Sequence, residues 1–164
     1  MTSALTIYAA GPIDLGTDLP NWRGDLINII NSAGYVAVMF DPASAFKNAS
    51  WGALDVKRSL YIEQLNKFAL ELSSTFIACV PKNVPSVGTP IEIEFADKAS
   101  CTSYLLTDIE PGKSVYLDNR FDEYHRILVD DMNDNACVRQ ALYKLADALI
   151  NDAKGPKNHF HDDE

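Results

Sequence analysis

A glutamate in the middle of the chain has the setting of a reactive carboxylate. Glu92 ends the segment Thr89-Pro90-Ile91-Glu92, which follows a short β-branched apolar run at 75–80 that is typical of a buried strand. Pro90 suits the first helical position, so the segment predicts a loop that turns into a helix with Thr89 as its N-cap. A carboxylate held there near hydroxyl groups suits nucleophilic or acid/base chemistry at an acetal-like carbon.

The same four residues also fit a structural motif, the capping box. In this motif a glutamate three positions after the N-cap reaches back to the N-cap amide, and the helix dipole favours its charge. Taken alone, the local pattern favours this structural interpretation over catalysis. On a helix Glu94 would point in a different direction from Glu92, so it is expected at the surface. The alternative is that Glu94, and not Glu92, is the catalytic acid.

Other polar side chains follow the ends of two more predicted strands. Apolar runs at 5–10 and 35–40 are stopped by Gly-Pro and Asp-Pro pairs. Because the carboxyl ends of parallel strands meet at one edge of a sheet, the three loops can converge on one pocket, and this edge is where open α/β sheets bind ligands. The residues gathered there would be Tyr8, Gly11, Asp14, Asp41 and the segment from Ser86 to Glu92.

Helical patterns alternate with strand patterns along the chain. Beyond the three strands above, the sequence predicts helices over 20–34, 53–72, from 89 onward, near 121–129 and over 136–152, and strands at 102–107 and 115–117. This alternation indicates a doubly wound, mostly parallel five-stranded α/β sheet. We expect one domain over 1–154 and a flexible acidic tail at 155–164.

Composition and charge narrow the class of partner. The 164 residues include 14 basic and 23 acidic side chains, which argues against a nucleic-acid polymer because phosphate neutralisation needs a surface rich in Lys and Arg. A mononucleotide is not excluded, since backbone N–H groups and one or two polar side chains can hold it. No stretch is long enough to span a membrane and no basic segment precedes an apolar core at the N-terminus, so we expect a cytoplasmic protein with no membrane partner.

Several familiar active-site signatures are missing from the sequence. It has no GxGxxG fingerprint, no Walker loop and no histidine before position 125, which argues against dinucleotide, P-loop and Ser-His-Asp chemistry. Cys79, Cys101 and Cys137 are widely spaced and form neither a disulfide framework nor a CxxC metal site. Cys79 and Cys101 are expected in the core, and no metal site is predicted.

Two blocks of the chain resemble a known family. Ile7-Tyr8-Ala9-Ala10-Gly11-Pro12-Ile13-Asp14 with Trp22-Arg23, and Ser86-Val87-Gly88-Thr89-Pro90-Ile91-Glu92-Ile93, are similar to the signature blocks of the nucleoside 2-deoxyribosyltransferase superfamily. The branch that the chain most resembles is that of the nucleoside 5′-monophosphate N-glycosidases, which includes CMP and hydroxymethyl-CMP hydrolases. The order of predicted elements agrees along most of the chain, whereas the specific motifs cover only these two blocks.

The resemblance implies a flavodoxin-like fold, a homodimer or larger homo-oligomer, and no metal or organic cofactor. Glu92 matches the family's nucleophile, which attacks C1′ of the sugar and expels the base, after which water or a second base opens the glycosyl ester. Tyr8 matches the tyrosine that orients this nucleophile. Ser86 stands where the monophosphate hydrolases have a phosphate-binding serine, with the N–H groups of Val87 and Gly88 beside it.

Structural roles remain open for the same residues. Tyr8 could be a half-buried strand tyrosine and Ser86 an ordinary turn residue. Asp14 could contact the sugar or base, or make an Asx-turn. The expected substrate-binding set is completed by Gly11, Arg23 and Asp41.

The chain departs from the family pattern at one functional position. Deoxyribosyltransferases carry an aspartate in the helix before strand three, and the matching residue here is Asn66, which can bond a hydroxyl but cannot act as a general acid. In the family pattern the pyrimidine-nucleotide hydrolases also tolerate asparagine there, so Asn66 favours that branch. In the family a neighbouring subunit completes the pocket, and the candidates for that residue are Asp118 and Asn119.

These observations predict hydrolysis of the N-glycosidic bond of a pyrimidine nucleoside 5′-monophosphate through a glycosyl-Glu92 intermediate. Within the enzymes, the alternative is base exchange by a 2-deoxyribosyltransferase. Outside them, the alternative is a non-catalytic nucleotide-binding module in which Glu92 is only a cap.

Overall fold

Five parallel strands form the centre of the protein. The computed structural model describes residues 4–12, 20–42, 56–86 and 88–155. The sheet has the order β2-β1-β3-β4-β5, which is the flavodoxin-like order of a doubly wound fold and confirms the predicted fold class. Its strands are β1 (Leu5–Ala10), β2 (Ala37–Phe40), β3 (Thr75–Val80), β4 (Thr102–Thr107) and β5 (Arg126–Leu128).

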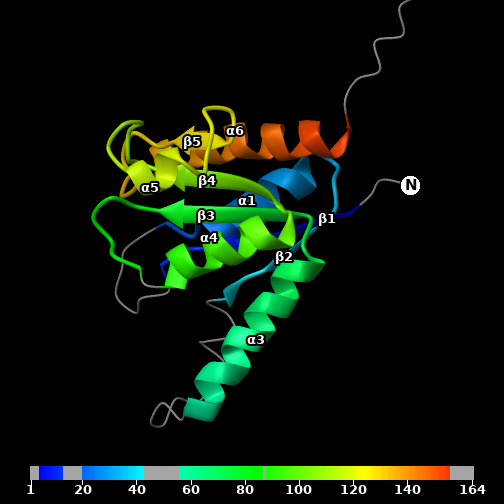
Figure 1. The fold of residues 1–164 in the computed structure, drawn as a ribbon. Coiled ribbons are helices and arrows are strands. Elements are labelled where there is room, and N and C mark those ends of the chain that lie inside the picture. Colours follow the sequence, from blue (N-terminus) through cyan, green and yellow to red (C-terminus); the bar gives the residue numbers. More distant parts are fainter. Residues whose placement is uncertain (1–3, 13–19, 43–55, 87, 156–164) are drawn as a thin grey trace, which may run out of the picture.

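Helices cover both faces of this sheet (Figure 1). One face is covered by α1 (Trp22–Ser32) and α6 (Asn135–Ala153), and the other by α3 (Val56–Leu72), α4 (Gly88–Ala99) and the short α5 (Val115–Asp118). The N-terminal part of α3 projects beyond the sheet (Figure 1). None of the helices in the described ranges is long and apolar enough to cross a membrane.

Strand β1 shows how one short sequence serves two cores. Its residues alternate between the faces of the sheet, as the strand period of two requires. Leu5, Ile7 and Ala9 join the core under α1 and α6, whereas Tyr8 and Ala10 join the core under α3, α4 and α5. A strand covered on both faces needs a continuous apolar run, and this is why 5–10 was recognisable in the sequence.

The long helices α1 and α6 begin and end close to the residues that capping chemistry predicts. The Asp134 side chain accepts a hydrogen bond from the Ala136 amide and begins α6, and the Asn21 side chain accepts one from the Gly24 amide and begins α1. After α1, Gly34 adopts φ +85°, a left-handed conformation that glycine adopts without a Cβ clash. The helices expected over 20–34 and 136–152 are therefore confirmed with small shifts at their ends.

The sequence predicted a strand at 115–117 and a helix near 121–129, and both assignments were wrong. Residues 115–117 belong to α5, because the Ser114 side chain accepts from the Leu117 amide and starts a helical turn. The fifth strand lies at Arg126–Leu128, inside the range predicted as helical. It pairs with β4 from Leu105 to Thr107, so pairing with an existing edge decided its conformation. The expected tail lies outside the described residues from 156 onward.

Candidate active site

The side chains of Glu92 and Tyr8 meet at the carboxyl edge of the sheet. The Tyr8 hydroxyl donates a hydrogen bond of 2.6 Å to Glu92 Oε1, and both side chains are buried. Tyr8 lies on β1, and Glu92 lies in the second turn of α4, the helix that follows β3. Since β1 and β3 are neighbours at which the chain reverses its direction of winding, the pair occupies the topological switch point where doubly wound proteins bind ligands.

Burial decides the protonation of this pair. It raises the pKa of the Glu92 carboxyl, while the hydrogen bond from Tyr8 and the positive charge of Arg23 act in the opposite direction. Burial and the neighbouring carboxylate raise the pKa of Tyr8 well above its ordinary value. Tyr8 therefore keeps its proton and can donate to Glu92 at every pH near neutrality.

Aromatic rings hold Tyr8 in place from both sides. Phe40 on β2 and Phe76 on β3 are the register partners of Tyr8, and their ring centroids lie 5.2 and 5.9 Å from that of Tyr8. Sequence reasoning did not assign either phenylalanine to the site. Only the strand register reveals that the three rings form one row.

Arg23 contacts the ends of both β1 and β2. Its Nε donates to the Ala9 carbonyl at 3.0 Å and lies 3.1 Å from Asp41 Oδ1. Its Nη2 is buried and has no hydrogen-bond partner among the described residues. A Cβ added at Gly11 would lie 3.2 Å from this Nη2 and 3.1 Å from Cys79 Cβ, so any larger residue would crowd both neighbours. Gly11, Arg23 and Asp41 are thus brought together, as the sequence suggested.

The start of α4 differs from the predicted capping box. The helix begins at Gly88, so Thr89 lies inside it and is not its N-cap. The Thr89 amide donates to Ser86 Oγ at 3.3 Å, and the two hydroxyl groups lie 2.8 Å apart. Ser86 therefore serves the amide that Glu92 was expected to serve. Glu92 instead turns inward to Tyr8.

A small cavity opens beside this helix start. It has a volume of about 150 Å³ and lies between the carboxyl end of β3, the first turns of α4, and α5. Ser86, Thr89 and Pro90 line one side of it, and Ile109, Tyr116 and Leu117 line the other. Glu92 is not part of its wall, because Glu92 faces β1 on the other side of the helix.

Asn66 is another partly buried polar side chain on this face of the sheet. It lies on α3 one turn before Leu70, which is buried in the core shared with Tyr8. Its Oδ1 is buried with no hydrogen-bond partner in the described part of the chain. An unpaired buried acceptor carries a free-energy cost that a ligand hydroxyl or amine could relieve.

Two of the remaining predicted residues lie at the surface. Gly88 is the exposed first residue of α4, and Asn119 is the exposed residue that follows α5. No hydrogen bond between Asn119 and Glu92 is found among the described residues. Asp14 and Val87 lie outside the described residues.

Comparisons with known proteins find the same fold in several solved structures. No family model and no curated protein matches this sequence. A 2-deoxyribosyltransferase of Bacillus psychrosaccharolyticus superposes with a TM-score of 0.55 at 11% identity, over 83% of this chain and 96% of that one. The CMP N-glycosidase BcmB of Clostridium botulinum superposes with a TM-score of 0.50 at 19% identity, over the same shares.

The fold is also shared with a protein of a different kind. A protein of Salmonella typhimurium LT2 that has been assigned as a sugar-binding protein superposes with a TM-score of 0.52 at 13% identity. The match covers 92% of this chain and 39% of that protein. At such identities the three comparisons establish the fold alone, and the chemistry has to be argued from the site.

Proposed function

We propose that this protein hydrolyses the N-glycosidic bond of a nucleoside 5′-monophosphate, with a pyrimidine as the base. The observation that carries the proposal is the buried Glu92 carboxylate, held at 2.6 Å by a tyrosine at the switch point of the sheet. The resemblance of both signature blocks supports it. So does the fold shared with a CMP N-glycosidase and a 2-deoxyribosyltransferase.

The proposed reaction has two steps at C1′ of the sugar. Ionised Glu92 attacks C1′ through a carboxylate oxygen as the bond to the base breaks, and the base leaves with the electron pair of that bond. Water then attacks C1′ of the glycosyl ester and gives one proton to the departed base, which releases the Glu92 carboxylate and the sugar 5-phosphate with retained configuration. The Tyr8 hydroxyl keeps one carboxylate oxygen fixed, so that the other oxygen can face the sugar.

Three further groups are proposed to hold the substrate. Ser86 and the amide of Gly88 stand at the start of α4, where the helix dipole favours the charge of a phosphate. Asn66 offers its unpaired Oδ1 to a sugar hydroxyl. As an amide it binds without donating a proton to the leaving base.

The first test is a release assay without an acceptor base. Nucleoside 5′-monophosphates and the matching nucleosides are incubated with the protein, and free base is quantified by chromatography. Release from a monophosphate and not from its nucleoside is the expected result. Turnover that appears only when a second base is added would make the protein a transferase, and nucleotide binding without turnover under either condition would make it a binding module.

Glu92→Gln separates the nucleophile from a structural glutamate. We expect Glu92→Gln to abolish turnover while nucleotide binding persists, since the amide is isosteric but is not a nucleophile. The matched control is Glu71→Gln, which changes an exposed glutamate near the end of α3. Mass spectrometry of acid-quenched wild type should also find the sugar phosphate on the peptide that contains Glu92. Wild-type turnover in Glu92→Gln would refute the mechanism.

We also propose that a second copy of the chain completes the pocket with Asn119. Large apolar side chains are exposed on α3 and α4, where Phe68 is 58% exposed, Leu72 64% and Ile91 50%, and such a surface suits an interface between subunits. The test mixes inactive Glu92→Gln with inactive Asn119→Ala. Mixed dimers would regain one intact pocket, whereas no recovery after subunit exchange would contradict a pocket shared between subunits.

A further inference from the structure

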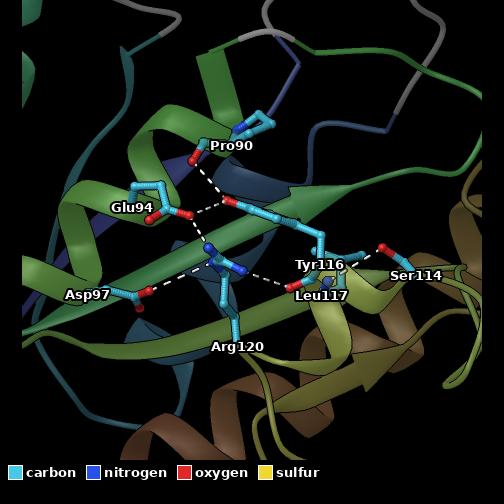
Figure 2. Close-up of polar contacts among 7 residues, drawn as sticks. All are labelled: Pro90, Glu94, Asp97, Ser114, Tyr116, Leu117 and Arg120. Carbon is cyan, nitrogen blue, oxygen red and sulfur yellow. Dashed lines mark hydrogen bonds and ion pairs between the residues drawn. The ribbon is translucent and has the colours of Figure 1, made fainter.

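A polar cluster joins α4 to α5 and to the turn that follows α5 (Figure 2). Arg120 Nη2 donates to Glu94 Oε1, and Arg120 Nε lies 3.9 Å from Asp97 Oδ2. The Tyr116 hydroxyl is 3.0 Å from the Pro90 carbonyl and 3.2 Å from Glu94 Oε1. The Arg120 guanidinium also lies 3.9 Å from the centre of the Tyr116 ring. We call these five residues the α4–α5 latch.

The latch contacts the part of α4 that carries Glu92. Pro90, Glu94 and Asp97 follow one another at spacings of four and three, so they form one stripe along the helix. A second stripe faces the sheet and consists of Thr89, Glu92, Ile93 and Ala96. Since the latch contacts lie both before and after Glu92 on the first stripe, they resist rotation of α4 about its axis.

The other half of the latch is itself anchored. The short helix α5 buries Leu117 in the core and is capped by Ser114. Asp118 accepts a hydrogen bond of 2.7 Å from Arg126 Nη2 on β5 and another of 3.0 Å from the Gly112 amide. The latch therefore connects the nucleophile helix to the far edge of the sheet.

We propose that Arg120 and Tyr116 are positioning residues for Glu92, acting through Glu94 and the Pro90 carbonyl. A side-chain tip lies about 5–6 Å from a helix axis, so a rotation of α4 by about 10° moves the Glu92 carboxylate by about 1 Å. A misplacement of that size can lower a rate by about 100-fold. The consequence for rate rests on the proposed function, whereas the consequence for the Tyr8–Glu92 hydrogen bond does not.

A merely structural role for the latch would leave a different trace. Glu94 is 44% exposed and Arg120 25%, and ion pairs at such sites contribute little to stability. A structural role therefore predicts a small change in melting temperature and an unchanged rate per folded molecule. A positioning role predicts a fall in kcat with KM nearly unchanged, because the substrate contacts remain.

The first experiment compares two tyrosines that donate to carboxylates. Tyr116→Phe removes the hydroxyl that bridges Pro90 and Glu94, and Tyr124→Phe removes one that lies 3.1 Å from Asp152 Oδ1. Arg120→Met is paired in the same way with Lys154→Met, which removes a cation 5.7 Å from the Tyr35 ring. We expect kcat to fall by about 10-fold or more in the two latch variants and to stay within two-fold in the two controls.

Two further measurements make the inference decidable without turnover. Carbon-13 NMR titration of the Glu92 carboxyl, assigned with Glu92→Gln, should show a midpoint at higher pH in Arg120→Met than in wild type, because Tyr8 would no longer reach the carboxylate well. The reversed pair Glu94→Arg with Arg120→Glu should return both the titration and kcat toward wild type. A Glu92 titration that is the same in wild type and both latch variants would overturn the inference. Failure of the proposed function would show instead as wild type that releases no base.

Discussion

Replacement of Tyr8 by phenylalanine tests how the protein controls its buried carboxylate. The substitution removes one oxygen and keeps the ring between Phe40 and Phe76, so the two ring contacts stay in place. What is lost is the 2.6 Å hydrogen bond to Glu92, which is only 8% exposed. A hydrogen bond to a charged group contributes about 1.5–3 kcal/mol, which corresponds to about 10- to 150-fold in an equilibrium.

This free energy should appear as a pH-dependent loss of rate. In the proposed mechanism Glu92 attacks only when it is ionised, and its pKa is already raised by burial. Without the Tyr8 hydroxyl the charged form loses its donor, so the pKa of Glu92 rises further and the acidic limb of the rate profile moves to higher pH. On this limb we expect a loss of about 10- to 150-fold, whereas at high pH only the smaller loss from poorer orientation remains.

The assay is base release by Tyr8→Phe over a range of pH, with Tyr104→Phe as the matched control. Tyr104 is also a fully buried strand tyrosine that donates to a carboxylate, that of Asp152, but it belongs to the core on the other face of the sheet. Its variant should keep the wild-type pH profile. A loss of rate in Tyr8→Phe that is equal at every pH would refute the reasoning, since Tyr8 would then not control the ionisation of Glu92.

Three further predictions concern stability. The raised pKa of Glu92 means that the folded protein holds this proton more tightly than the unfolded chain does, so wild-type stability falls as pH rises above the unfolded pKa of about 4.3. Glu92→Gln should therefore unfold at a higher urea concentration than wild type at pH 7 and at a similar concentration at pH 4. A variant that is less stable than wild type at pH 7 would contradict this. Gly11→Ala should cost about 1–3 kcal/mol and lower the rate, because its Cβ would crowd Cys79 and Arg23, while Gly88→Ala, where a Cβ meets nothing within 4 Å, should leave chemical denaturation unchanged. Leu142→Ala, in the core under α6, should cost about 2–5 kcal/mol with an unchanged rate per folded molecule, and a large loss of kcat at full folding would contradict that separation.

The sequence predicted the elements whose signals are local. The strands at 75–80 and 102–107 are confirmed at both ends, since each is a short apolar run with a clear stop. The fifth strand was missed because it has only three residues and begins with Arg126, a residue type that is rarely buried. Arg126 is tolerated there because Asp118, on α5, pairs with its guanidinium. That partner cannot be known before the fold is known.

The candidate site could also be predicted only in part from the sequence. The pattern of strand ends placed Tyr8 and Glu92 at one edge of the sheet, because parallel strands force their carboxyl ends together. It could not give the row formed by Phe40, Tyr8 and Phe76, which depends on strand register. It also could not give the contact between Arg120 and Glu94, which are 26 positions apart, one in the turn after α5 and the other on α4.

The two interpretations of Glu92 differ in which group binds the Thr89 amide. In a capping box the glutamate would accept from the N-cap amide and gain from the helix dipole at little cost, because that position is exposed to solvent. Here the Thr89 amide is bound by Ser86, and Glu92 is buried against Tyr8 with a raised pKa. Burying a carboxylate with so few donors works against folding, and a glutamine would make the same contact without that penalty. Stability alone would not retain such a feature, and this is the physical reason for our proposal that Glu92 is the nucleophile.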